Sequence, residues 1–433
     1  MFNGNVIRDT LLDLQTVSNI TIHADKHVGR RTYQYAFNCD LLIRGAAIPV
    51  ILCVPDDWDR ELIHIYIKNP KNVPFMPHIE KDGKLCLFDL EGVLVDLNFQ
   101  GLLSQCVERA VEILEAGLYE DTDEEFVREF SSYWSYLPNL LNMKVSFSKL
   151  QRSQIMKYIW EIPCRRKKQS YAQYVSQYKN TCIYASNETD YFRLKNLKGQ
   201  QQNGLYCYIN ASKFIVPPDF RKPLSIDYFN KLLSVMEPLN KSVEINKAIN
   251  SQLVVFNINQ PNGAETCIAI YFKNGKLKNT IDGRFKICES KKFFLSPIYV
   301  EREDKPFLIK RTNENLYNNR RILLIGCGSI GSYMCNELIK SGLEEITVVD
   351  MDILKAENIY RHLLGMEYVG QYKAEAICQY FGKNIPNLNM KPVAEDIREA
   401  VEEGSIDFSE FDLIVSAIGN HNVNRWINTE IKK

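Results

Sequence analysis

The chain has 433 residues, 45% of them hydrophobic, so it is long enough to bury two or three separate cores. Lys and Arg together number 53, as do Asp and Glu, and this balance excludes a general basic surface for nucleic acid or an anionic membrane. The first twenty residues lack the apolar run of a secretory signal, and the apolar run 46–54 is too short to cross a bilayer. Twelve dispersed cysteines are typical of reduced thiols, so we expect a cytoplasmic protein.

Residues 1–150 are predicted to form an α+β domain. An amphipathic pattern predicts a helix over residues 5–20, and three or four strands follow between residues 31 and 68. The clearest of these strands are 33–43 and 47–54. An extended segment, residues 74–89, comes next and precedes a long helix.

The extended segment holds a cysteine in an unusual setting. The turn Asp82-Gly83 precedes Cys86, and His78 stands eight residues before the thiol. A lone intracellular cysteine is usually a small buried side chain, so Cys86 also has a purely structural interpretation. That interpretation is the one we give to three cysteines in apolar patterns, Cys39, Cys53 and Cys106.

Residues 74–89 resemble the signature of ubiquitin-conjugating enzymes, in which a His-Pro-Asn turn precedes Gly-x-x-Cys. Here the turn is Met76-Pro77-His78, and Gly83 precedes Cys86. The resemblance implies that Cys86 is a nucleophile that carries an acyl group as a thioester. His78 stands where the family has Asn. It could donate a hydrogen bond to the oxyanion, take a proton from the attacking amine, or only brace the loop.

Residues 151–315 are predicted to form a second, central α+β unit. Strands are expected at 181–185, 204–210, 253–258 and 267–272, and a helix at 226–249. The many aromatic residues follow the strand periodicity, which favours core positions over a base-stacking platform. No chemistry is assigned to this unit, and we expect a structured spacer.

Residues 316–433 begin with a phosphate-binding pattern. An apolar strand, 321–325, runs into Gly326-x-Gly328-x-x-Gly331 and then into a helical pattern. A second strand, 345–349, ends in Asp350, about 20 residues beyond the loop, where a carboxylate can bind ribose hydroxyls. Up to this point a dinucleotide would fit as well as ATP.

Further residues favour a triphosphate. Asn358 and Arg361 follow Asp352, and Lys373 heads a predicted helix at 373–381. Attack on an α-phosphate builds charge on the departing pyrophosphate, and two added cations would stabilise it. Each residue alone also has a plain interpretation, as a solvated charge or a helix cap.

The runs GCGSIG, VVDMD and ENIYRHLLG resemble the adenylation domain of ubiquitin-activating enzymes and of their bacterial relatives that activate sulfur carriers. The resemblance implies a Rossmann-like fold that binds ATP and Mg²⁺, with Asp350 at the ribose and Asn358, Arg361 and Lys373 at the phosphates. Gly419 stands where the family has an Asp, so either Asp352 or a residue outside this sequence supplies that carboxylate, or adenylation is slow or absent. The chain stops within the first helix that is expected after strand 412–416, so we expect a truncated domain without the activating cysteine. Without CxxC pairs, no metal-ligating residues are predicted.

The two modules together resemble the fused proteins of bacterial type II CBASS antiphage operons. That resemblance implies activation of a protein C-terminus, transfer through Cys86 to an amine, a cGAS-like nucleotidyltransferase as partner, and a homodimer through the adenylation domain. Two alternatives stay open: a NAD-binding Rossmann oxidoreductase and a non-catalytic docking fragment.

Overall fold

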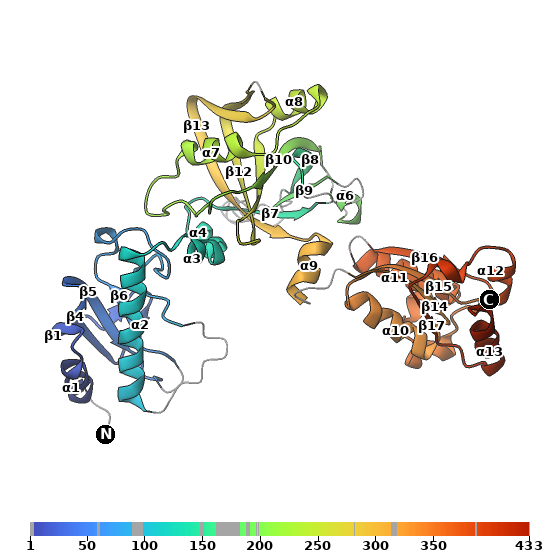
Figure 1. Cartoon of the computed structure of the whole chain (residues 1–433), viewed down its shortest axis with the longest axis horizontal. Helices are drawn as coiled ribbons and strands as arrows, with labels where there is room; N and C mark the ends of the chain where they lie inside the picture. Colours follow the sequence, from blue (N-terminus) through green and yellow to red (C-terminus); the bar gives the residue numbers. More distant parts are fainter. Residues whose placement is uncertain are drawn as a thin grey trace, which may run out of the picture.

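The structure is a computed structural model of the chain, and it describes residues 4–58, 61–88, 98–147, 151–161, 182–187, 191–195, 197, 199–280, 282–312, 318–385 and 388–432. Figure 1 shows three bodies in chain order: a sheet crossed by a long helix, a β-barrel, and a parallel sheet flanked by helices. Within the described ranges, no helix has both the length and the apolar character that a membrane span needs.

The N-terminal body is an antiparallel sheet covered by helices. Its elements are α1 Gly4–Asp13, β1 Val17–Ile22, β2 His27–Val28, β3 Arg31–Thr32, β4 Tyr35–Ile43, β5 Ala46–Val54, β6 His64–Ile67, η1 Pro70–Asn72 and α2 Phe99–Tyr119. The sheet order is β1-β4-β5-β6, and the apolar faces of α1 and α2 join its core. Strands β4 and β5 confirm two predicted strands.

The predicted helix over residues 5–20 is wrong beyond Asp13. Residues Val17–Ile22 instead form the edge strand β1, which pairs antiparallel with β4. Val17, Ile20 and Thr21 are β-branched, which favours a strand once a neighbouring edge is available. Asn19 has a φ of 55°, at the bulge that separates the two paired parts of β1.

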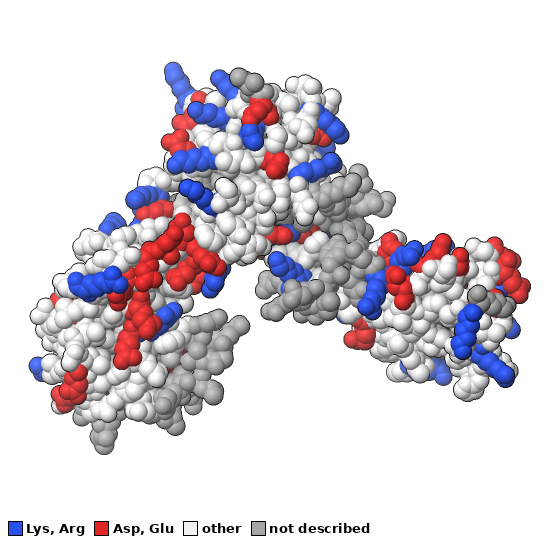
Figure 2. All heavy atoms as spheres, in the orientation of Figure 1, with Lys and Arg blue, Asp and Glu red and all other residues white. Residues whose placement is uncertain are grey.

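Two short helices, α3 Asp123–Arg128 and α4 Phe130–Ser135, connect this body to the barrel. Trp134 of α4 is buried, and its indole Nε1 donates to Ile298 O of the barrel at 2.9 Å. Figure 2 shows acidic side chains gathered over the helix-covered face of the N-terminal body, where α2 contributes Glu108, Glu112 and Glu115. The neutral net charge of the chain therefore hides a local acidic surface.

The central body is a closed barrel with the strand order β10-β11-β12-β13-β7-β9-β8. Its elements are β7 Leu141–Ser146, β8 Gln154–Glu161, β9 Cys182–Ser186, α6 Tyr191–Leu194, β10 Gln202–Asn210, α7 Ile226–Val235, α8 Ser242–Ile249, β11 Leu253–Asn259, β12 Glu265–Asn279 and β13 Phe285–Arg302. Strand β7 pairs with β9 and β13, so the barrel begins ahead of residue 151. The single helix expected over 226–249 is wrong: it is two helices, α7 and α8. Pro238 lies between them, and proline lacks the N–H that a helix interior needs.

The C-terminal body is a four-stranded parallel sheet in the order β16-β15-β14-β17. Its elements are α9 Lys305–Thr312, β14 Asn318–Ile325, α10 Ser329–Lys340, β15 Leu343–Val349, η2 Ala356–Arg361, η3 Met366–Tyr368, α11 Lys373–Asn384, β16 Asn389–Val393, α12 Ile397–Glu402, η4 Phe408–Glu410, β17 Leu413–Ser416 and α13 His421–Glu430. One core joins α10 and α11 to one face of the sheet, and another joins α12 and α13 to the other. The chain reverses direction across the sheet between β14 and β17, and in such folds ligands bind beside that point at the carboxyl ends of the strands.

Candidate functional sites

The glycine loop after β14 has the geometry that its spacing predicts. Gly326 has a φ of 92°, a conformation that side chains rarely adopt. A Cβ on Gly331 would lie 2.9 Å from the carbonyl carbon of Gly326 and closer still to its oxygen, so only glycine lets α10 approach the strand. Nothing lies within 4 Å of a Cβ built on Gly328. The loop therefore leaves open space at the N-terminus of α10, where backbone N–H groups favour an anion.

A cavity of about 300 Å³ opens beside this loop, at the carboxyl ends of β14, β15 and β17. Among its lining residues are Gly326, Gly328, Asp350, Asp352 and Lys373, all of which the sequence singled out. The Asp350 carboxylate accepts hydrogen bonds from the N–H groups of Cys327 at 2.6 Å and Asp352 at 2.9 Å. Asp350 thus ties the loop to the end of β15, while its remaining lone pairs stay available to a ligand.

Lys373 reaches the cavity from the first residue of α11. Its Nζ pairs with Asp352 Oδ2 at 2.7 Å, and its N–H donates to Asp352 O at 2.9 Å. Lys373 is only 8% exposed, whereas the Asp352 side chain is 60% exposed. The ammonium is therefore held at the cavity by a solvent-facing carboxylate, an arrangement that an incoming phosphate can join.

The structure does not bring Asn358 and Arg361 to the cavity wall. Asn358 Oδ1 accepts from Lys355 N–H at 3.0 Å, and this contact caps η2. Arg361 is exposed at the end of the same short helix, and neither residue lines the cavity. For Asn358, the capping interpretation describes what the side chain does here.

Sequence reasoning missed His362, which braces the glycine loop. Its Nε2 contacts Cys327 O at 2.7 Å, while Nδ1 accepts from Leu364 N–H at 3.1 Å, so Nε2 carries the proton and donates. Burial lowers the pKa of His362, which favours this neutral form. The contact spans 35 residues, and no local pattern around His362 signals it.

The position of the missing family carboxylate also lies at the cavity. Gly419 and Asn420 line it after β17, as do Glu395 and Asp396 from the segment before α12. Asp396 is occupied as the N-cap of α12, and its hydrogen bond from the Arg398 side chain lowers its pKa. Asp352 and Glu395 are thus the exposed carboxylates at this wall. In the part of the chain that the structure describes, no group of three acidic, His or Cys side chains could hold a metal ion by itself.

The second site surrounds Cys86, which is exposed on the segment between β6 and α2. The Cys86 N–H donates to His78 O at 2.9 Å, so the thiol and the imidazole are linked through the backbone. Gly83 has a φ of 90°, and a Cβ there would lie 2.6 Å from Pro70 and 2.9 Å from Ile67 O. The Asp82-Gly83 turn therefore packs tightly under the segment and presents Cys86 to solvent.

His78 is held by the α3–α4 region. Its Nδ1 lies 3.1 Å from Glu129 Oε1, and its Nε2 lies 3.4 Å from Glu125 Oε2. The His78 N–H donates to Tyr133 Oη at 2.6 Å, and that hydroxyl donates to Glu129 Oε2 at 2.7 Å. His78 has a φ of 63°, a left-handed conformation that these contacts and the Cys86 N–H bond hold in place.

These contacts determine the charge of His78. Hydrogen bonding to the Cys86 side chain, and then to Glu129, raises the pKa of His78 from 6.5 to about 10. Burial raises the pKa of Glu129, but the hydrogen bonds from His78 and Tyr133 outweigh it and leave that pKa below its usual value. An imidazolium therefore lies beside the thiol at neutral pH, paired with a carboxylate that sequence reasoning missed.

The other cysteines provide a contrast. Cys39, Cys53 and Cys106 are buried, as predicted, and burial raises the pKa of Cys106 to about 11. Among the cysteines in the described ranges, Cys86 is the one that is exposed.

Two family models match the N-terminal and C-terminal parts of the chain. Residues 13–142 match Prokaryotic E2 family B, and residues 305–433 match the ThiF family. The chain therefore joins a region similar to prokaryotic E2 proteins to a region similar to ThiF proteins.

Individual relatives match parts of the chain. The chain is 31% identical over 137 residues to the ATP-dependent ubiquitin transferase-like protein Cap2 of Pseudomonas aeruginosa, covering 30% of this chain and 24% of that protein. It is 29% identical over 114 residues to the NEDD8-activating enzyme E1 catalytic subunit of Dictyostelium discoideum, covering 26% of this chain and 25% of that protein. The chain thus matches about a quarter of the length of these curated relatives. A solved structure of E. coli MccB with AMPCPP and MccA is 26% identical, covers 28% of this chain and 36% of that chain, and has a TM-score of 0.24.

Proposed function

We propose that this chain uses ATP to activate the C-terminal carboxylate of a protein, carries the acyl group on Cys86 as a thioester, and transfers it to an amine. The observation that carries the proposal is the exposed Cys86 thiol beside a protonated His78, in a chain that also holds a phosphate loop with an open cavity. Neither site alone would imply a relay of this kind.

We propose roles in ATP binding for the residues around the cavity. The N–H groups at the start of α10 would bind a phosphate where Gly328 leaves space, and Asp350 would accept from ribose hydroxyls. Lys373 would stabilise the charge that develops on the pyrophosphate. Arg361 would add a second cation only after its exposed side chain turns toward the loop. No phosphate role is assigned to Asn358, because its amide caps η2.

Magnesium fits the cavity as an ion held jointly with phosphate. Mg²⁺ is usually bound through one or two carboxylates together with substrate phosphates, rather than by an all-protein cage. Asp352 and Glu395 are the exposed carboxylates that would hold it, and they would stand in for the Asp that Gly419 replaces. Bound there, the ion would neutralise phosphate charge.

Because His78 is positively charged, it can act as a hydrogen-bond donor but not as a base. With a pKa of about 10, the imidazolium cannot take a proton from an attacking amine at neutral pH. It can donate to the oxyanion that forms when the amine attacks the thioester carbonyl carbon. When the C–S bond then breaks, the same positive charge stabilises the departing Cys86 thiolate.

The proposed partners are a target protein and a second copy of the chain. We propose a cGAS-like nucleotidyltransferase as the target, because the two modules resemble fused antiphage proteins. We also propose a cytoplasmic location, because the cysteine content is typical of reduced thiols. The adenylation body exposes large apolar side chains at Ile330 and Tyr333 of α10 and at Tyr360 and Met366. We propose that this body, with these exposed apolar side chains, pairs with a second copy of the chain. The acidic face over α2 disfavours nucleic acid as a partner.

Pyrophosphate exchange tests the activation step. The chain is incubated with ATP, Mg²⁺ and labelled pyrophosphate, with and without a cGAS-like nucleotidyltransferase from the same genome. We expect label in ATP only when the nucleotidyltransferase is present, and none with a version that lacks its last residues. Thermal stabilisation by NAD, with none by ATP, would contradict the proposal and favour an oxidoreductase.

A further inference from the structure

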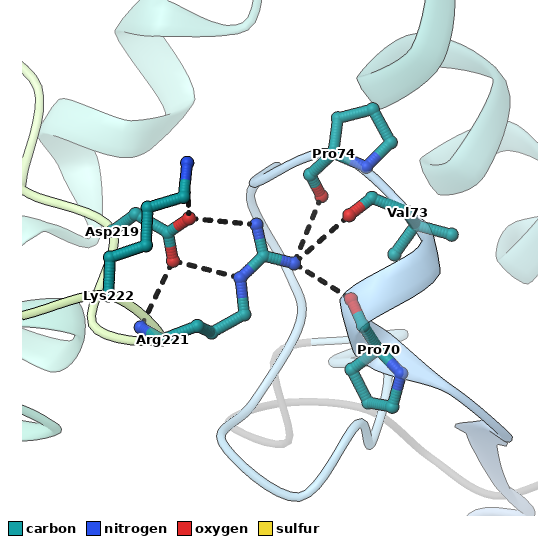
Figure 3. A network of polar contacts seen from close by, with 6 residues as sticks. All are labelled: Pro70, Val73, Pro74, Asp219, Arg221 and Lys222. Carbon is teal, nitrogen blue, oxygen red and sulfur yellow. Dashed lines mark hydrogen bonds and ion pairs between the residues drawn. The ribbon is translucent and has the colours of Figure 1, made fainter.

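A loop of the barrel body grips the segment that leads to the Cys86 site. The Arg221 guanidinium donates through Nη1 to Pro70 O at 2.8 Å, Val73 O at 3.1 Å and Pro74 O at 3.4 Å. Figure 3 shows this fan of contacts, which joins residues about 150 positions apart in the chain. Arg221 is therefore a bridge between the barrel and the E2-like module.

Asp219 holds the guanidinium from the other side. Its Oδ1 accepts from Arg221 Nε at 2.8 Å, and its Oδ2 accepts from Nη2 at 3.1 Å, so the pair is bidentate. Both side chains are largely buried, 18% exposed for Arg221 and 12% for Asp219. Burial raises the pKa of Asp219, but the Arg221 hydrogen bonds outweigh it and keep the pKa below its usual value. Asp219 thus stays ionised and fixes the orientation of the Arg221 guanidinium.

Aromatic contacts extend the bridge to His78. Arg221 lies over the Phe75 ring, 5.4 Å from its centroid, and Phe220 lies 5.7 Å from the same ring. Phe220 also stacks on Tyr133, with ring planes 7° apart. Tyr133 is the residue whose hydroxyl accepts the His78 N–H and donates to Glu129. The barrel loop therefore packs directly on the side chain that positions the imidazolium.

The chemistry of the contact requires arginine. Three backbone carbonyl groups accept from Arg221 Nη1, while Nε and Nη2 donate to Asp219. Only a planar guanidinium has enough donors in a fixed geometry to make all of these contacts. The segment that holds these carbonyls, residues 70–74, lies between the last strand of the E2-like sheet and His78. Without the Arg221 guanidinium, this contact would no longer hold the three carbonyl groups in their present direction.

We infer that Arg221, held by Asp219, is a positioning residue that makes the Cys86 site dependent on docking of the barrel. This role rests on the proposed function of Cys86 as an acyl carrier. Because His78 must hold a left-handed conformation beside the thiol, a shift of residues 70–78 would move the imidazolium away from Cys86. A displacement of about 1 Å at a reacting site can lower a rate by about 100-fold.

Alkylation of Cys86 by iodoacetamide tests this role in the whole chain. The rate is followed across the neutral pH range as the mass of the peptide that carries Cys86. We expect Arg221→Ala to slow alkylation at neutral pH by about 10-fold or more, because the imidazolium would no longer be held beside the thiol. Arg221→Lys keeps the charge but loses the fork, so an intermediate rate is expected. Amide hydrogen exchange over residues 70–78 should rise in both variants.

The chain offers a matched control. Arg284 pairs with Asp282 at the same two-residue spacing and donates to Met236 O at 2.9 Å, entirely within the barrel body. Arg284→Ala should leave Cys86 alkylation unchanged. The inference is overturned if Arg221→Ala reacts as the wild type does, or if Arg284→Ala slows alkylation equally, which would indicate general loosening of the barrel. Alkylation needs neither ATP nor a partner, so it reports the positioning of the Cys86 site separately from thioester formation, and failure of the one can be told from failure of the other.

Discussion

Replacing Gly331 with alanine should open the nucleotide site by forcing α10 away from β14. The new Cβ would lie 2.9 Å from the carbonyl carbon of Gly326, 3.2 Å from Ala417 Cβ, and closest to the Gly326 oxygen. That oxygen belongs to backbone and not to a flexible side chain. The Gly326 peptide is also fixed, because its N–H donates to Val349 O at 2.8 Å.

The size of the effect follows from how far the backbone must move. An ordinary carbon–oxygen contact is about 3.3 Å, so the helix and the loop must separate by about an ångström or more. Overpacking of this kind costs about 1–3 kcal/mol. If this cost lowers the free energy of local opening, the amide groups of that region lose about 5-fold to 150-fold of their protection against hydrogen exchange.

Hydrogen exchange measures this loss of protection region by region in the whole chain. It is the suitable method because a single free energy of unfolding does not describe a chain of three bodies. Peptides over β14 and α10 should exchange faster in Gly331→Ala, while barrel peptides keep the wild-type rate. Gly328→Ala is the matched control, because its Cβ meets nothing within 4 Å. It should keep full protection yet bind ATP about 10-fold more weakly, since the methyl group enters the phosphate space. Equal protection in Gly331→Ala and wild type would refute the steric argument.

Three further predictions concern charges at the two sites. Lys373→Met should lower ATP affinity by about 10-fold or more in isothermal titration, because it removes a charge-assisted contact to phosphate; unchanged affinity would contradict that role. Folding raises the pKa of His78 from 6.5 to about 10, so its protonated form stabilises the native state fully below about pH 6.5 and this contribution is lost as pH rises through about 10. The wild-type melting temperature should therefore fall over that window more steeply than in His78→Gln, and parallel curves would argue against the ion pair. Glu129→Gln should lower the pKa of His78, measured by NMR titration of the imidazole; a pKa that stays near 10 would mean that Glu129 does not hold the charge.

Local sequence patterns predicted those parts of the structure that depend on near neighbours. Strands β4 and β5 follow from alternating apolar residues, and the loop at Gly326 follows from spacing and steric requirements. Cys86 was singled out by its turn, its distance from His78 and the resemblance of residues 74–89 to a conjugating-enzyme signature. Each of these signals is local in the sequence.

Contacts between distant segments were not predictable in the same way. Closure of the barrel depends on β7 pairing with β13, and β10 with β11, across long separations. The partner of His78, Glu129, lies between α3 and α4, and Arg221 comes from a different body. Arg361 and Asn358 fitted a family pattern, but both lie on the short helix η2 and neither lines the cavity.

The central claim is that Cys86 receives an acyl group made with ATP. Its most direct test is the mass of the peptide that carries Cys86, after the chain has been incubated with ATP, Mg²⁺ and a cGAS-like nucleotidyltransferase. We predict an adduct equal to the C-terminal peptide of the nucleotidyltransferase, absent without ATP, absent in Cys86→Ala, and released by added thiol. An unmodified Cys86, while an amide product still forms, would contradict the account.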